Sequence, residues 1–425
     1  MAFTMALRLI VGFLVFVMVA RHLGVNQFGT FMYWMTVATL AAQVVNFGSG
    51  PYMLKELGAN PESRPQIVGG VGASKFVLAS LVILASLVAT PWISDSTPIY
   101  WCLLLTALAE VISEYIFCAF RGMNDFMTEV WFSAAVSCVH LVLLVAATAA
   151  GAGLLGIAGT FTASRTIAAL GAGLVYRRRF GGFGIRQNWP NWKTTLSQNK
   201  AYAADTFLTN LYAQIDSILL KHLSGPEALG IYQAGLRLLQ GLNNIAPVLS
   251  NVYLPRISSD IKHGNDHSRT ASLLYIQLVG FGLIVAIGFL CLGGEIVDIL
   301  YGSQFEALKP LLPWFGALLL LRLFASNFGI LLTASGHQAS RAWSVGACLI
   351  IVVVSGFWLI PTHGALGMIW SALIATLVLA ITYVTKASTT KARHCWGKAQ
   401  IALSVTGFIV VIIFLIKAQA IAARP

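Results

Sequence analysis

Several charged side chains of this 425-residue chain lie inside long apolar stretches of sequence. A charged group at the centre of a membrane helix costs about 2.5–3.5 kcal/mol, so such residues usually have a function. Arginine is well suited to bind an anion there, because its planar guanidinium stays charged and donates paired hydrogen bonds to phosphate oxygens. The candidates for a phosphate-binding site are Arg8, Arg165, Arg237 and Arg322. Alternatively, one or two of these side chains, Arg8 above all, extend to the membrane surface.

A second group of embedded charges contains both signs and suggests ion pairs. By the helix limits predicted below, Lys75 and Glu110 each lie nine residues from the same membrane surface. Glu114 follows Glu110 by four residues and shares its helix face. Asp216 and Arg237 are close in depth on two later helices. We expect pairs that either lock neighbouring helices or open during transport to bind a proton or a sodium ion.

Uncharged polar side chains also accumulate in the apolar segments. Their amides suit the hydroxyl groups of a sugar, but hydrogen bonds between helices, worth roughly 0.6–2 kcal/mol each, explain them equally well. The set is Gln43, Asn46, Asn210, Gln214, Gln240, Asn243, Asn244 and Asn327.

The elements that must position these residues are long apolar segments. Hydrophobic residues make up 57% of the chain and charged residues 10%, whereas soluble proteins are about a quarter charged. About 20 apolar residues in a helix cross the hydrocarbon core of a bilayer. We predict an all-α polytopic membrane protein with twelve transmembrane helices and a thirteenth candidate at 399–416. The twelve are 1–20, 30–49, 66–90, 98–119, 128–150, 154–176, 200–222, 228–252, 269–292, 308–335, 340–360 and 366–385.

The positions of Lys and Arg predict the orientation, because cytoplasmic loops retain positive charge. With Met1 in the cytoplasm, 17 of the 27 Lys and Arg residues fall in inner loops and five in outer loops. This bias predicts a cytoplasmic N-terminus for the multi-pass protein, and it explains most of the net charge without nucleic acid. The first apolar run lacks a cleavage site, so we interpret it as a span. No Cys/His cluster has metal-ligand spacing, so we expect no cofactor beyond coupled H⁺ or Na⁺.

The sequence further predicts two related halves. A basic connector, 177–199, separates a six-helix lobe at 1–176 from another at 200–386, and a basic tail with a possible extra helix follows at 387–425. Three short motifs recur in order at offsets of 201, 214 and 211 residues, beginning with His22-Leu23-Gly24 and His222-Leu223-Ser224-Gly225. Six helices per repeat is an even number, so the lobes share one orientation and relate by a pseudo-twofold axis along the membrane normal. Such repeats typically bind substrate between the lobes.

These motifs resemble the polysaccharide transporter branch of the multidrug/oligosaccharidyl-lipid/polysaccharide (MOP) exporter superfamily, the O-antigen flippase-like proteins. The resemblance is carried by 20–24 with Phe28-Gly29, by 216–220 with 225–234, by Leu254-Pro255-Arg256-Ile257 and by 299–305. It implies a flippase of the bacterial cytoplasmic (inner) membrane that moves a polyprenyl-pyrophosphate-linked oligosaccharide by alternating access, without catalysis. Related flippases carry basic groups in a central cavity. The implied partners are the lipid-linked oligosaccharide, membrane lipids, and polysaccharide polymerase and export machinery.

Two other functions are weighed against this one. An ion-coupled drug exporter of the same superfamily should carry more acidic and aromatic residues in its cavity and fewer arginines. A membrane glycosyltransferase or polymerase needs a sizeable external loop with catalytic groups. The longest external connector here, 293–307, offers Glu295, Asp298 and Glu306 without a base partner. The embedded arginines therefore favour the flippase.

Overall fold

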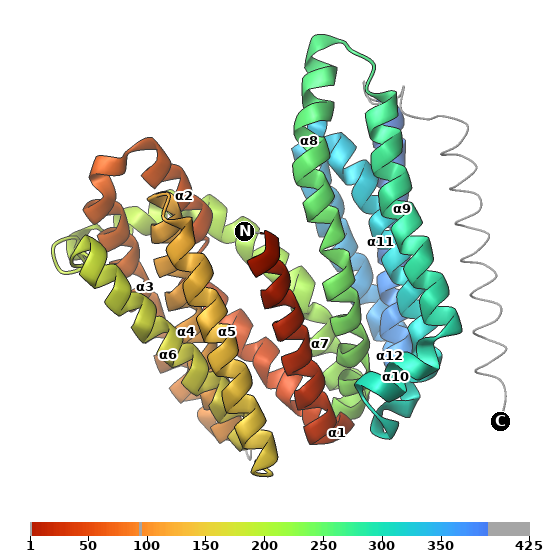
Figure 1. Cartoon of the computed structure of the whole chain (residues 1–425), viewed down its shortest axis with the longest axis horizontal. Coiled ribbons are helices and arrows are strands. Elements are labelled where there is room, and N and C mark those ends of the chain that lie inside the picture. The colour runs from red at the N-terminus through yellow and green to blue at the C-terminus, as the bar shows by residue number, and fades with distance from the viewer. Residues whose placement is uncertain (1, 93–95, 390–425) are drawn as a thin grey trace. The chain divides into compact units, whose positions relative to one another are not determined.

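The structure, a computed structural model, describes residues 2–92 and 96–389 (Figure 1). Every regular element within those residues is a helix. Short 3-10 helices are η1 (Pro61–Ser63), η2 (Thr90–Trp92), η4 (Trp189–Asn191) and η5 (Ser303–Leu311). The α-helices are α1 (Ala2–Asn46), α2 (Ser49–Ala59), α3 (Arg64–Ala89), α4 (Thr97–Gly122), α5 (Phe126–Ala149), α6 (Leu154–Phe180), α7 (Trp192–Asn243), α8 (Ile245–His263), α9 (Ser268–Cys291), α10 (Gly293–Leu300), α11 (Leu312–Ala334) and α12 (Gln338–Thr389). The predicted thirteenth helix lies outside the described residues.

Three of these elements are each two helices joined at a glycine. The breaks fall at Gly24 in α1 (φ 71°), Gly225 in α7 (φ 90°) and Gly364 in α12 (φ 56°). A positive φ strains residues that carry a Cβ atom, so glycine is required there. An unbroken α-helix of 45 residues would be about 68 Å long, more than twice the bilayer core. Dividing at the three glycines, with α2 and α8 continuing the segments before them, gives twelve spans in the described residues, as predicted.

Hydropathy alone recognises only part of this arrangement. Eight stretches of the described residues are long and apolar enough to cross a membrane, and two of them, Ile10–Ala59 and Trp343–Ser388, contain a glycine break. The described residues of α7 are not among these stretches. Its sequence contains Lys200, Asp205, Asp216, Lys221 and Arg237, which lower its mean hydropathy.

Helix limits differ from the prediction where helices continue past the apolar residues. The connector predicted at 177–199 is mostly helical, because α6 runs to Phe180 and α7 begins at Trp192. The helix predicted at 228–252 continues as α8 to His263, after an interruption at Asn244. An apolar segment ends at the edge of the hydrocarbon, but a helix can extend beyond it, so hydropathy underestimates helix length.

The chain forms two compact units. Unit 1 comprises 1–23 and 30–218, and unit 2 comprises 24–29 and 219–425. The short segment 24–29 thus packs with unit 2 although both its neighbours in sequence belong to unit 1. The other transition lies inside α7, between Ile218 and Leu219. The predicted domain boundaries stay a prediction.

Unit 1 is built around α4, which packs against α2, α5 and α6. Its core contains aromatic side chains from α2, α4 and α6, among them Tyr52, Tyr115, Phe120 and Tyr176. The phenol of Tyr115 donates a hydrogen bond of 2.7 Å to the carbonyl oxygen of Val68 on α3. This contact attaches α3 to the core.

Glycines on α3 allow the connector that follows α6 to pack closely against this helix. A Cβ atom on Gly69 would lie 2.6 Å from the carbonyl oxygen of Gly184, and one on Gly70 would lie 2.7 Å from the Thr195 hydroxyl. The Asn188 amide fastens the same connector by donating to the carbonyl oxygens of Pro65 and Gly184. The connector is therefore packed against unit 1.

Unit 2 is built around α11, which packs against α8, α9 and α12. Tyr275, Val279 and Leu320 form one of its buried clusters.

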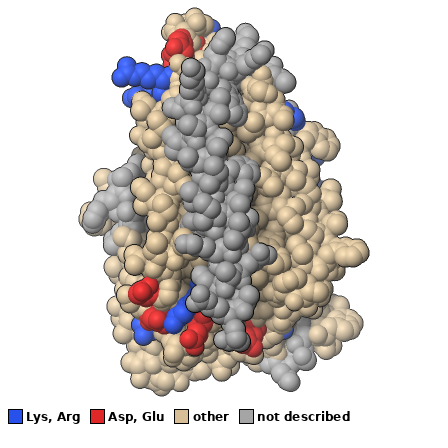
Figure 2. Space-filling view, turned by 90° about the vertical axis from the view of Figure 1, so that its right-hand side faces the viewer, with Lys and Arg blue, Asp and Glu red and all other residues tan. Residues whose placement is uncertain are grey.

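Large apolar side chains are also exposed on the surface of unit 2, such as Ile284, 71% exposed, and Trp358, 79% exposed. On the face shown in Figure 2, the coloured Lys, Arg, Asp and Glu gather toward the two ends. An apolar band between charged ends is what a surrounding bilayer requires.

Two equivalent glycines make a close backbone contact inside unit 2. A Cβ atom on Gly29 would lie 1.8 Å from the carbonyl oxygen of Pro226, and one on Gly230 would lie 2.1 Å from that of Val25. Val25 corresponds to Pro226, and Gly29 to Gly230, at the offset of 201 residues predicted for the repeat. The contact is thus reciprocal, as across a local twofold axis.

We expect Gly29→Ala and Gly230→Ala to destabilise the protein, because each added methyl group would push two backbones apart. Overpacking of this kind costs about 1–3 kcal/mol. Thermal unfolding in detergent measures the effect. The matched controls are Gly12→Ala and Gly241→Ala, because a Cβ atom at either position meets nothing within 4 Å. Equal unfolding temperatures for all four variants would contradict the contact.

Candidate functional site

Lys75 lies buried in unit 1, with only 6% of its surface exposed. Its Nζ atom is 3.5 Å from the carbonyl oxygen of Val45, 3.4 Å from that of Asn46 and 3.5 Å from Asn46 Oδ1. The predicted pairing of Lys75 with Glu110 was wrong, since neither Glu110 nor Glu114 forms an ion pair with Lys75 within the described residues. Two side chains at equal depth meet only if each helix is rotated about its axis so that they face each other, and depth alone does not ensure this.

The oxygens around Lys75 come from a break in the second span. Phe47 (φ 46°) and Gly48 (φ 62°) both adopt the left-handed conformation between α1 and α2. The last carbonyls of a helix have no partner within it, and in a membrane such groups must be satisfied by the protein. Gly48 also allows a close approach, because a Cβ atom there would lie 2.3 Å from the backbone of Tyr202.

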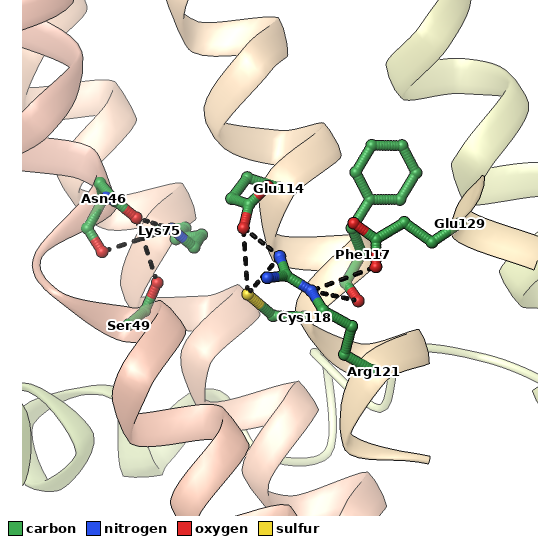
Figure 3. A network of polar contacts seen from close by, with 8 residues as sticks. All are labelled: Asn46, Ser49, Lys75, Glu114, Phe117, Cys118, Arg121 and Glu129. Atoms are coloured by element: carbon green, nitrogen blue, oxygen red, sulfur yellow. Dashed lines mark hydrogen bonds and ion pairs between the residues drawn. The ribbon is translucent and has the colours of Figure 1, made fainter. Parts of the chain in front are cut away.

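Beside Lys75 lies a network of charged groups on α4 and α5 (Figure 3). Arg121 pairs with Glu114 on its own helix and, through Nε at 3.2 Å, with Glu129 on α5. The thiol of Cys118 donates to Glu114 at 3.5 Å. Together with Lys75, the network contains two cations and two carboxylates, so its formal charges balance.

Arg121 and Glu129 were missed as site residues because each lies near a predicted helix end. One feature of the sequence could have predicted the Glu114–Arg121 pair. Glu114 and Arg121 are seven residues apart, two helical turns, and therefore lie on one face of α4. Glu129 lies in the first turn of α5, after the tight turn that contains Asn124 (φ 59°).

Arg165 on α6 pairs with Glu110 on α4, with Nη2 and Oε1 3.9 Å apart. The choice of Arg165 as a phosphate-binding candidate did not anticipate this ion pair. The pair is open to its surroundings, since the Arg165 side chain is 37% exposed and that of Glu110 60%. Next to Arg165, Ser164 contacts the ring of His140 on α5 at 2.5 Å, a buried polar contact that sequence reasoning missed.

Asp216 and Arg237 belong to different units. Asp216 is buried, and its Oδ1 atom accepts hydrogen bonds from the backbone amide and the hydroxyl of Ser217. Arg237 is half-buried and donates to the Gln240 side chain at 3.1 Å. The relation predicted between Asp216 and Arg237 stays a prediction.

Arg322 is half-buried on α11, in the middle of an otherwise apolar helix. Among the side chains that the structure describes, it has neither an ion-pair nor a hydrogen-bond partner. One and a half turns further along α11, Asn327 is only 2% exposed, and its Oδ1 atom has no partner in the same part of the chain. The Arg8 side chain lies outside what the structure describes, so a single site formed by all four arginines stays a prediction.

Several of the predicted sugar-binding amides form hydrogen bonds with other groups of the protein. Asn46 donates to Gln43 at 3.1 Å, Gln214 accepts from Thr36 at 3.3 Å, and Asn244 donates to the carbonyl oxygen of Gln240 at 2.9 Å. Only the Thr36–Gln214 contact joins two helices, α1 and α7, as the structural alternative expects. The other two contacts lie within four residues along the chain. Two acids of the connector predicted to be external pair with a cation that follows it: Lys309 lies 2.9 Å from Asp298 and 3.9 Å from Glu306.

We expect Arg121→Gln to destabilise unit 1, because it leaves Glu114 and Glu129 with no shared cation. A fully buried pair broken in this way costs 3–5 kcal/mol, and the partial exposure here reduces the expected cost to about 1–2 kcal/mol. The double variant Arg121→Gln with Glu129→Gln should recover part of this loss in thermal unfolding. The control is Lys55→Gln, at the exposed Lys55–Glu56 pair, which should change stability by less than about 0.5 kcal/mol. Additive effects of the two network substitutions would contradict the network.

Two solved structures with a similar fold are a flippase and a multidrug transporter. A lipid II flippase MurJ in an inward closed conformation matches 98% of this chain and 92% of its own, with a TM-score of 0.75 and 13% sequence identity. An inward-facing multidrug resistance MATE family transporter of the MOP superfamily matches 90% of this chain and 95% of its own, with a TM-score of 0.69 and 12% identity. At such low identity these likenesses show the fold, and they confirm the two-lobed, all-helical architecture.

Sequence comparison gives the family. Amylovoran biosynthesis protein AmsL of Erwinia amylovora is 30% identical over 160 residues, 36% of this chain and 40% of that protein. Teichuronic acid biosynthesis protein TuaB of Bacillus subtilis (strain 168) is 26% identical over 183 residues, 42% of this chain and 37% of that protein. Each match thus spans less than half of the relative's length. The family described as "Polysaccharide biosynthesis protein" matches residues 2–262. With more than half of its length matched, this chain belongs to the polysaccharide biosynthesis protein family and has the MOP superfamily fold.

Proposed function

We propose that the protein is a flippase that moves a polyprenyl-pyrophosphate-linked oligosaccharide across the bacterial cytoplasmic membrane by alternating access, with its N-terminus in the cytoplasm. The family provides the polysaccharide context. The fold, shared with a lipid II flippase, provides a scaffold that accommodates a lipid-linked substrate. The protein contributes binding and conformational change, and we assign no catalytic step to it.

The observation that carries this proposal is the half-buried Arg322 in an apolar helix, without a partner among the described side chains. An arginine in hydrocarbon needs water, a carbonyl group or an anion. A pyrophosphate offers paired oxygens that match the guanidinium geometry. Arg237, on α7 of the same unit, is the second candidate for this contact. Arg165 is a weaker candidate, because Glu110 already neutralises it in part.

An ion-coupled drug exporter is the second candidate function, because a multidrug transporter shares the fold. A site for cationic drugs needs available carboxylates. Glu110, Glu114 and Glu129 each lie within 4.0 Å of an arginine, which leaves them less available to bind a cationic drug.

A membrane glycosyltransferase or polymerase is the third alternative. The acids of the connector predicted to be external would then have to act as catalysts, but Asp298 and Glu306 pair with Lys309.

Coupling to an ion gradient belongs to the same proposal. Asp216 is the best candidate for a group that binds H⁺ or Na⁺, because it is a buried carboxylate on the polar helix α7. Glu110 and Glu114 are less suited, since an arginine already neutralises each of them. A polysaccharide polymerase and export machinery would take up the flipped substrate on the other side.

We expect Arg322→Ala to reduce translocation at least about tenfold, which corresponds to the loss of one charge-assisted contact of ~1.4 kcal/mol. The measurement is the accessibility of a lipid-linked oligosaccharide in liposomes that contain the purified protein. Arg322→Lys should retain part of the activity if the positive charge alone matters. It should retain none if the paired hydrogen bonds of the planar guanidinium are needed. The exposed Arg269 on α9 provides the control, since Arg269→Ala should translocate like the wild type.

A comparison of Arg165→Ala with Glu110→Gln distinguishes a contact of Arg165 with the substrate from a structural role of the Arg165–Glu110 pair. If Arg165 contacts the substrate, Arg165→Ala should lower translocation and Glu110→Gln should not. Equal losses in both variants would assign the pair to structure alone. Normal translocation by Arg322→Ala and Arg165→Ala together would overturn the phosphate-binding proposal.

A further inference from the structure

The break between α1 and α2 is an oxygen-lined site that a cation already occupies. Its three oxygens are the carbonyls of Val45 and Asn46 and the side-chain oxygen of Asn46. Asn46 itself is held in place, since it donates to Gln43 at 3.1 Å and accepts from Ser49 at 3.5 Å. Figure 3 shows the ammonium of Lys75 beside Asn46 at this break.

Oxygens at a helix break attract cations for two reasons. The C-terminal end of a helix carries a partial negative charge from its aligned carbonyls. In broken membrane helices, unwound carbonyls and helix C-termini coordinate small monovalent cations. The break at Phe47 and Gly48 has both features, because the preceding helix ends at Asn46. Here the cation is not a free ion but the ammonium group of Lys75, a residue of α3.

No ion pair competes with these oxygens for the Lys75 ammonium in the part of the chain that the structure describes. Within the described residues, no carboxylate forms an ion pair with it, and the nearby Glu114 is engaged by Arg121 and Cys118. The ring of Tyr115 lies 6.0 Å from Nζ and adds a weaker cation–π attraction. Because the side chain is 6% exposed, the ammonium contacts the protein rather than bulk water.

We propose that Lys75 is a built-in cation that completes the broken second span, and that shortening its side chain converts the break into a binding site for a small primary alkylammonium ion. Lys75→Ala removes the three carbons and the ammonium that propylammonium would replace. Lys75→Met removes the charge but fills the space. The proposal concerns a positioning role for Lys75 and goes beyond the transport function proposed above.

The test measures thermal unfolding of purified Lys75→Ala, Lys75→Met and wild-type protein with propylammonium, and with propan-1-ol as an uncharged molecule of the same shape. Both variants should unfold at lower temperature than the wild type. Propylammonium should restore about half of the loss for Lys75→Ala in a saturable manner, as a ligand of the folded state does. Propan-1-ol should not restore it, and Lys75→Met and the wild type should not respond to propylammonium. Absence of the restoration, or an equal response of Lys75→Met, would overturn the proposal.

A second measurement covers the case in which Lys75→Ala does not fold. Hydrogen exchange of the backbone amides in residues 46–53 should be at least about tenfold faster in Lys75→Met than in the wild type, because the break opens locally. Unchanged exchange in this segment would contradict the proposed role of Lys75. Neither measurement uses transport, so a failure here is distinct from a failure of the flippase proposal.

Discussion

The organisation of this protein follows from one constraint: polar and charged groups within a membrane must find partners inside the protein. The second span shows this most directly. Its helix ends at Asn46, and the carbonyl groups exposed by the break face the ammonium of Lys75. The same constraint explains why Arg121 lies between Glu114 and Glu129, and why Arg165 lies beside Glu110. Unit 1 thus contains embedded charges that largely neutralise one another.

Glycine is the residue that makes this packing possible. At Gly24 and Gly225 it allows a chain conformation that separates two spans, and at Gly29 and Gly230 it allows two backbones to touch. These four glycines occur at the same offset in the two halves. The internal repeat therefore preserves a local geometry together with a few motif residues.

The number of spans and the fold could be predicted from the sequence because both depend on hydropathy and on chain breakers such as Gly24 and Gly225. The partners of the embedded charges could not. Depth along a helix can be estimated from residue numbers, so Lys75 and Glu110 were expected to meet. Which way a side chain faces depends on the rotation of each helix, and that is set by packing: Lys75 faces the break at Asn46, whereas Glu110 faces Arg165. The close approach of α3 to the connector, through Gly69 and Gly70, is likewise visible only in three dimensions.

Arg322 stands apart from this pattern, since none of the carboxylates that the structure describes pairs with it. In our account its partner is the phosphate of the substrate. The most direct measurement is the affinity of the purified protein for a polyprenyl pyrophosphate compared with the uncharged polyprenol of the same length. The account predicts at least about tenfold tighter binding of the pyrophosphate, or ~1.4 kcal/mol, and loss of that preference in Arg322→Ala. Equal affinity for both lipids in the wild type would contradict it.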